Sequence, residues 1–325
     1  MPVLAAAGPL LDVRGLVVSF PGRRGAKRAV DGLDYSIAPG RTLGVVGESG
    51  CGKTVAALAL MRLVPPPGRI EHGAIGIAGI DVMALDDGGL RDLRGQRVAM
   101  VFQDPAASLN PVYTIGTQVA EAYLLHRQMD ARAAAEAAVA MLARVGIPDA
   151  RRRADSYSHQ LSGGMRQRAM IAMALACRPA LLIADEPTTA LDATIQAQIL
   201  DLMQELQDET STAIQFISHN LGVVASVAHD VMVMYAGRAV ETGPAEDVLR
   251  HPLHPYTQAL IETLPRLGQR RDRLPAIQGG VPDPGASSGG CRFAPRCPRA
   301  DAACRAADPA LEDKGPGRRV ACFKA

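Results

Sequence analysis

The sequence predicts an α/β protein with a mostly parallel sheet covered by helices. Strand-like and helix-like segments alternate over the first 250 residues, which is the pattern of repeated strand–helix–strand units. A glycine-rich stretch, GESGCGKT at residues 47–54, stands between a strand-like and a helix-like run. An alanine-rich stretch at 131–146 interrupts the alternation with helix alone. These observations indicate a sheet-based core with a helical insertion.

Short apolar runs bounded by turn residues predict the strands of this core. The expected strands lie at 11–20, 41–46, 98–103, 180–185, 212–218 and 231–237. The first expected helix opens directly from the glycine-rich stretch, and Gly146 ends the alanine-rich one. The expected helices lie at 53–63, 131–146, 192–208 and after Asn220. Because strand-like runs are missing between 114 and 158, we expect an inserted helical subdomain at about 104–178.

Composition narrows the class of protein. The chain has 325 residues, 48% of them hydrophobic, and a formal charge of +2, which gives no general reason to expect a nucleic-acid partner. Apolar runs fall short of the roughly 18 to 20 residues that cross a bilayer, and the first residues lack the basic start of a secretion signal. We therefore expect a cytoplasmic protein.

The texture of the chain changes near residue 250, where we place a domain boundary. One helical piece is expected at 251–265, and a strap rich in proline and glycine is expected at 274–290. From Leu264 onward the chain has 12 Lys and Arg against 6 Asp and Glu, a local charge of +6. Residues 251–325 therefore form a distinct extension.

The stretch at 47–54 fits the phosphate-binding pattern G-x-x-x-x-G-K-[ST]. Its glycines let successive backbone N–H groups face a phosphate, Lys53 neutralises phosphate oxygens, and Thr54 offers a hydroxyl to Mg²⁺. The residues expected to bind nucleotide here are Gly47, Glu48, Ser49, Gly50, Cys51, Gly52, Lys53 and Thr54.

Further polar residues follow the expected strands. Asp185 and Glu186 end the run LLIADEP, where Asp185 is suited to hold Mg²⁺ and Glu186 to act as general base toward water. Gln103 and His219 also come just after strands, with Gln103 suited to touch Mg²⁺ or water and His219 to donate to a phosphate. A capping or packing role is the alternative for these last two.

A second glycine pair occurs in LSGGMRQR at 161–168, at the start of a helix-prone run. Together with GESGCGKT, VFQDP, LLIADEP, ALD at 190–192 and ISHN, this ordered set resembles the nucleotide-binding subunit of ATP-binding cassette (ABC) transporters over residues 11–250. The resemblance implies a P-loop cassette ATPase fold with an added antiparallel β subdomain, using ATP and Mg²⁺.

The resemblance also assigns the second glycine pair. In such ATPases two subunits pair head to tail, so Ser162, Gly163 and Gly164 would serve a nucleotide bound to the partner chain, with Asp192 in the nearby D-loop. Phe20 would stack on adenine, with a core position as the alternative.

Three segments of the extension, HPLHPYTQAL, CRFAPRCPRADAAC and VACF, make residues 251–325 similar to the C-terminal extension of ATPases that drive di- and oligopeptide importers. The resemblance implies a peripheral subunit on the cytoplasmic face of the membrane, paired with a second, paralogous ATPase. Two membrane permeases and an extracytoplasmic solute-binding protein would complete the system, with no nucleic acid. Import of nickel or another small solute, or a soluble cassette ATPase without a transporter, are the alternatives.

Four cysteines cluster in this extension, at positions 291, 297, 304 and 322. Four thiols in a segment without its own core suggest a metal that staples it. The spacing of Cys291, Cys297, Cys304 and Cys322 leaves an iron–sulfur cluster, zinc or unliganded thiols open. The resemblance to peptide-importer ATPases favours a [4Fe–4S] cluster, whose negative charge would match the basic extension; an ordinary solvated surface would also account for that charge.

Overall fold

The computed structural model describes the chain outside residues 1–7, 23–24, 190, 265–276 and 283–288. Ala190 of the ALD motif and most of the expected strap at 274–290 lie outside these described residues. The chain divides into two compact units. The first comprises Met1–Leu11, Ile37–Arg41 and Gly76–Gln215, and the second comprises Asp12–Ser36, Thr42–Ile75 and Phe216–Ala325.

The second unit is built on a sheet that begins with the strand before the phosphate loop. Strand β3 (Thr42–Val46) pairs in parallel with β9 (Asp230–Tyr235), and Leu43 faces Asp230 in the register. β9 returns through a two-residue turn, in which Ala236 and Gly237 both have positive φ, into the antiparallel strand β10 (Arg238–Pro244). The glycine-rich loop thus follows a strand held in a parallel pair.

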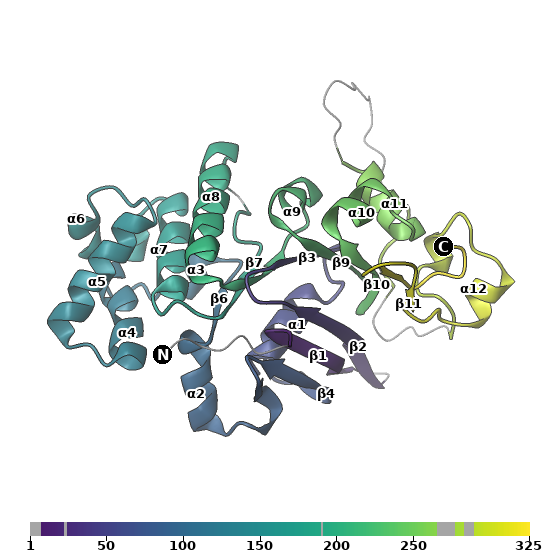
Figure 1. Cartoon of the computed structure of the whole chain (residues 1–325), viewed down its shortest axis with the longest axis horizontal. Coiled ribbons are helices and arrows are strands. Elements are labelled where there is room, and N and C mark those ends of the chain that lie inside the picture. The colour runs from purple at the N-terminus through teal and green to yellow at the C-terminus, as the bar shows by residue number, and fades with distance from the viewer. Residues whose placement is uncertain (1–7, 23–24, 190, 265–276, 283–288) are drawn as a thin grey trace. The chain divides into compact units, whose positions relative to one another are not determined.

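The C-terminal extension adds to this same sheet. Strand β12 (Arg319–Val320) pairs antiparallel with β10 and with β11 (Glu312–Asp313), so a short strand of the extension lies beside β10 (Figure 1). A further sheet of the unit has the order β2-β1-β4. Its strands are β1 (Leu11–Gly22), β2 (Gly25–Ile37) and β4 (Arg69–Ile77).

Short helices complete the second unit. α9 packs against β3, and the fit is close because a Cβ on Gly44 would lie 2.4 Å from Cγ1 of Val224. The helices are α1 (Lys53–Leu60), α9 (Leu221–Val227), α10 (Ala245–Arg250), α11 (Pro255–Glu262) and α12 (Ala302–Ala306).

The first unit contains the parallel pair β6 (Val98–Val101) and β7 (Leu181–Asp185), whose residues are all buried. This burial explains their nearly continuous apolar sequence. The short β5 (Ile80–Asp81) and the start of β8 (Ala213–Ile217) also belong here. The helices are α2 (Asp87–Gln96), α3 (Pro105–Ser108), α4 (Ile115–Arg127), α5 (Ala131–Arg144), α6 (Ala150–Ala154), α7 (Gly163–Leu175) and α8 (Ala193–Thr210).

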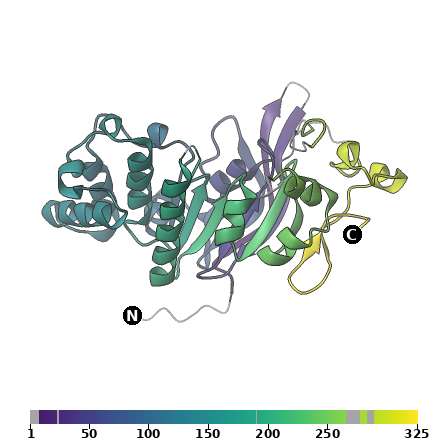
Figure 2. The same cartoon turned by 90° about the horizontal axis from the view of Figure 1, so that it is seen from above.

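The helical insertion predicted from the alanine-rich stretch is confirmed. Helices α4, α5, α6 and α7 pack on one another in both views (Figure 1, Figure 2). Asp130 caps α5 by accepting a hydrogen bond from the N–H of Ala133, and Gly146 follows the helix with φ 75°. Among the described residues, the helices are too short or too polar for a membrane span.

His254 caps α11 from a buried position. Its side chain is 2% exposed, and its Nδ1 accepts a hydrogen bond from the N–H of Tyr256 at 3.0 Å. Burial lowers the pKa of His254 to about 4, although the nearby carboxylate of Glu241 acts in the opposite direction. The imidazole is therefore neutral in the folded protein at neutral pH.

We predict that His254 makes the folded state sensitive to mild acid. The unfolded chain takes up this proton near pH 6.5 but the folded chain only near pH 4, so stability falls as the pH drops through this window, by on the order of 3 kcal/mol. His254→Asn keeps a cap acceptor and removes the titration. Urea unfolding between pH 7 and 4.5 should show a shallower loss for this variant than for exposed His251→Asn; equal slopes would contradict the prediction.

Candidate functional site

The glycine-rich loop between β3 and α1 has a shape that only glycine permits at two positions. Gly47 has φ 155°, and a Cβ there would lie 2.3 Å from the carbonyl oxygen of Met234. Gly52 has φ 103°, and a Cβ there would lie 2.3 Å from the carbonyl oxygen of Ala29. The loop is therefore pressed against the backbone of its own unit, as the phosphate-binding pattern requires.

Lys53 turns back into this loop. Its Nζ donates to the carbonyl oxygens of Gly47 at 2.8 Å and Glu48 at 3.1 Å, and the side chain is 7% exposed. Thr54, Ser49 and Gly50 are exposed, so the hydroxyls and the loop backbone can be reached from solvent. Cys51 is buried, and burial raises the pKa of its thiol, which makes it a packing residue of the loop.

Two other predicted residues belong to this unit. His219 is exposed and lies two residues after β8, and the neighbouring Asn220 caps α9 by accepting from the N–H groups of Gly222 and Val223. Phe20 is partly exposed at the end of β1, and its ring covers Gly68, where a Cβ would lie 2.4 Å from Cε1. Both residues keep surface that a ligand can contact.

The first unit brings Gln103 and Glu186 together. β6 and β7 run in parallel, with Val101 opposite Ala184, so the residues that follow both strands meet at one edge. Nε2 of Gln103 donates to Oε2 of Glu186 at 3.1 Å, and the hydroxyl of Thr189 donates to the same oxygen at 2.9 Å. The role of Thr189 in holding this carboxylate was not anticipated from the sequence.

Glu186 has a strained backbone, because its φ of 50° is in the left-handed region that non-glycine residues rarely adopt. Asp185 precedes it as the last residue of β7 and is 1% exposed. Asp185 and the amide oxygen of Gln103 give this unit two oxygen donors, which is the donor chemistry that Mg²⁺ prefers.

The second glycine pair opens helix α7. Ser162 caps this helix by accepting from the N–H of Met165, and a Cβ on Gly163 would meet nothing within 4 Å. Asp192 caps α8 in the same way through the N–H of Ile195, whose Cγ2 lies against Gly164. The exposed Ser162 and Gly163 thus leave the start of α7 open.

The four cysteines of the extension line one small cavity, together with Phe293 and Phe323 among others. The predicted clustering of these thiols is confirmed, but the predicted iron–sulfur site is not supported. Within the described residues, no group of three or more His, Cys, Asp or Glu side chains is arranged to hold a metal ion. Burial raises the pKa of the Cys291 and Cys297 thiols, so both are neutral in this structure.

Part of the basic surplus of the extension is matched by acidic residues from earlier in the chain. Arg292 pairs with Asp31, Arg318 with Glu241 and Arg296 with Glu48. Each of these acidic residues precedes residue 250, so the extension and the rest of its unit are complementary in charge. For Asp31, burial opposes ionisation, yet Arg238 and Arg292 together hold the pKa below its usual range.

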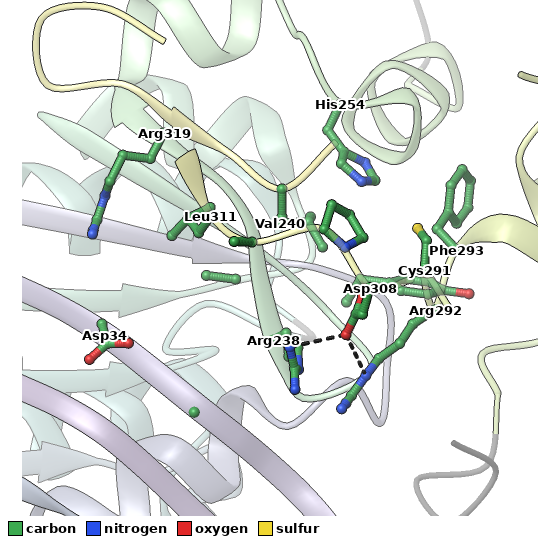
Figure 3. Close-up of a pocket in the computed structure, with 16 residues that line it drawn as sticks. Asp34, Arg238, Val240, His254, Cys291, Arg292, Phe293, Asp308, Leu311 and Arg319 are labelled. Carbon is green, nitrogen blue, oxygen red and sulfur yellow. Dashed lines mark ion pairs between the residues drawn. The ribbon is translucent and has the colours of Figure 1, made fainter. Parts of the chain in front are cut away.

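A cavity of about 440 Å³ lies beside this arginine-rich contact (Figure 3). Asp308 faces it and pairs with Arg238 and Arg292, while Val240 and Phe293 supply apolar wall. The ion pairs of Asp308 neutralise charge at the cavity wall and fix the extension to the start of β10.

Family comparisons match both parts of the chain, the part that carries the glycine-rich loop and the C-terminal extension. The ABC transporter family matches residues 30–189, and the C-terminal region of oligopeptide/dipeptide transporters matches residues 240–304. A protein of Brucella melitensis described as a peptide import ATP-binding protein is 53% identical over 93% of this chain and 93% of its own. A peptide ABC transporter ATP-binding protein of Sinorhizobium fredii is 49% identical over 97% of this chain and 95% of its own.

Solved structures show the same fold. The ATP-binding cassette MJ0796, a dimer in a post-hydrolysis state with ADP and Pi, superposes with a TM-score of 0.66 at 24% identity, over 72% of this chain and 98% of its own. CbiO1 from Clostridium perfringens, part of an ABC transporter complex, gives a TM-score of 0.63 at 25% identity, over 75% and 91%. The chain therefore belongs to the ABC transporter ATP-binding family, in the group that carries the oligopeptide/dipeptide transporter C-terminal region.

Proposed function

We propose that this chain is the ATP-hydrolysing subunit that powers uptake of di- or oligopeptides across the cytoplasmic membrane. The observation that carries this function is the loop before α1, closed around Lys53 and continuous in one unit with the peptide-transporter extension. In this proposal residues 1–250 form the nucleotide-binding domain, with the helical subdomain at about 104–178, and 251–325 form the importer extension.

The roles of the site residues follow from their chemistry. Lys53 and the backbone N–H groups of the loop neutralise the phosphates, and Thr54, Asp185 and Gln103 would hold Mg²⁺, which supplies charge neutralisation. Glu186 accepts a proton from the attacking water while the water oxygen bonds to the γ-phosphorus. The bond between the γ-phosphorus and the bridging oxygen breaks, and ADP leaves with its electron pair. His219 donates to the γ-phosphate.

Gln103 and Thr189 have a positioning role in this proposal. Both donate to Oε2 of Glu186, which holds this carboxylate oxygen in place. The strained backbone of Glu186 directs the carboxylate away from the course of β7. Phe20 supplies an aromatic surface for adenine.

We also propose the partners of this chain. The open start of α7 suits the phosphate of a nucleotide held by a second ATPase chain, through Ser162, Gly163 and Gly164, with Asp192 nearby. We propose a paralogous ATPase as that second chain. Two membrane permeases would anchor the pair at the cytoplasmic face, and an extracytoplasmic binding protein would deliver the peptide.

Replacing Glu186 tests the catalytic role. Glu186→Gln should bind ATP as the parent chain does but lose turnover by about a hundredfold or more, because the amide cannot accept the proton of water. The matched control is Glu205→Gln, on the exposed side of α8. Near-normal phosphate release by Glu186→Gln in the assembled transporter would show that another group is the base.

The four-cysteine cavity supports a shared ligand for its thiols, because Cys291, Cys297, Cys304 and Cys322 all line it. We propose a [4Fe–4S] cluster there, with Zn²⁺ as the alternative. Anaerobic purification should then yield about four iron and four sulfide per chain with a visible charge-transfer band, all lost in Cys304→Ser. Stoichiometric zinc, or neither metal, would contradict the cluster.

A further inference from the structure

Glu48 puts a negative charge into a loop that must receive a polyphosphate. Its carboxylate accepts two hydrogen bonds from one guanidinium, at 2.7 Å from Nη1 and 2.9 Å from Nη2 of Arg296. This bidentate pairing is the strongest geometry that an arginine and a carboxylate adopt. The Arg296 side chain is 4% exposed and that of Glu48 is 27% exposed, so the pair is largely shielded from solvent.

The guanidinium of Arg296 has several further contacts within its own unit. Its guanidinium also donates to the hydroxyl of Tyr235 and to the carbonyl oxygens of Ile277 and Gln278. It lies 5.8 Å from the ring centre of Tyr235 and 6.0 Å from that of Phe293. A planar, fully bonded guanidinium of this kind keeps its partner in one position.

The backbone of Glu48 has a second contact from the extension. The N–H of Glu48 donates to the hydroxyl of Tyr256 at 2.8 Å. The Tyr256 ring is fully buried between Tyr235 and Phe293, and burial raises the pKa of the phenol, so the hydroxyl stays neutral. The extension therefore holds both the backbone and the side chain of one loop residue.

The turn that presents Arg296 is itself fixed by the cysteine segment. The N–H of Ala294 donates to the carbonyl oxygen of Cys291, and the N–H of Cys291 donates to that of Cys304. Arg292, in the same turn, is bonded to Asp31 and to the carbonyl oxygen of Ala236. Arg296 thus reaches the loop from a rigid support.

We propose that Arg296 is a positioning residue for nucleotide binding, which neutralises Glu48 and holds its carboxylate so that the loop can accept phosphate. The inference rests on the proposed function, in which this loop binds ATP. Without the guanidinium, an uncompensated carboxylate would face the phosphates across partly desolvated space. The C-terminal extension is then part of the nucleotide site.

A single and a double variant of the full-length chain test this role. Calorimetric titration with Mg-ADP should show about tenfold weaker binding for Arg296→Gln, because a like charge now opposes the phosphates. The double variant Glu48→Gln/Arg296→Gln should recover to within about threefold of the parent, because it removes that charge. The loss in Arg296→Gln should shrink at high salt.

The controls separate charge from packing. Arg299→Gln removes an exposed arginine of the same segment. Within the described part of the chain, its side chain hydrogen-bonds only to Gln258, so this variant should bind Mg-ADP like the parent. Should Arg296→Gln not fold, Arg296→Lys serves in its place: it keeps the charge, loses the fork, and should bind two- to threefold more weakly.

Two results would overturn the inference: Arg296→Gln binding like Arg299→Gln, or a double variant as weak as Arg296→Gln, which would make the loss one of packing. Failure of the parent chain itself to bind Mg-ADP is a different outcome, because it would reject the proposed function together with the inference.

Discussion

The contact between the phosphate loop and the backbone around it is the constraint on which the rest of the site depends. Gly47 and Gly52 lie against carbonyl oxygens of Met234 and Ala29, with no room for a Cβ. The loop curls inward as a result, and its carbonyls hold the ammonium of Lys53. The ammonium of Lys53 is thereby kept within the loop, where a phosphate would have to bind.

Residues that form local patterns could be predicted from the sequence. The loop, the carboxylates after β7 and the cap at the start of α7 are each specified within about ten residues. The strands β2, β4 and β10 were not among those predicted. Their burial comes from packing between distant segments, which a single window of sequence does not reveal.

Contacts between distant residues could not be predicted. Tyr256 is 208 residues from Glu48 and Arg296 is 248 residues from it, so no local pattern pairs either residue with the loop. The charge imbalance of the extension is a signal whose partners lie far away in the sequence. Three of its arginines pair with Asp31, Glu48 and Glu241 of the same unit, and one of these pairs reaches the phosphate loop.

The central claim is that one chain carries a preformed phosphate loop but only half of a hydrolytic site, the other half being the start of α7 on a second chain. The most direct test is the ATP turnover per chain as a function of protein concentration, with light scattering to report association during turnover. We expect Mg-ADP binding at every concentration and turnover only as paired chains form. Full turnover by chains that scatter as monomers would contradict the account.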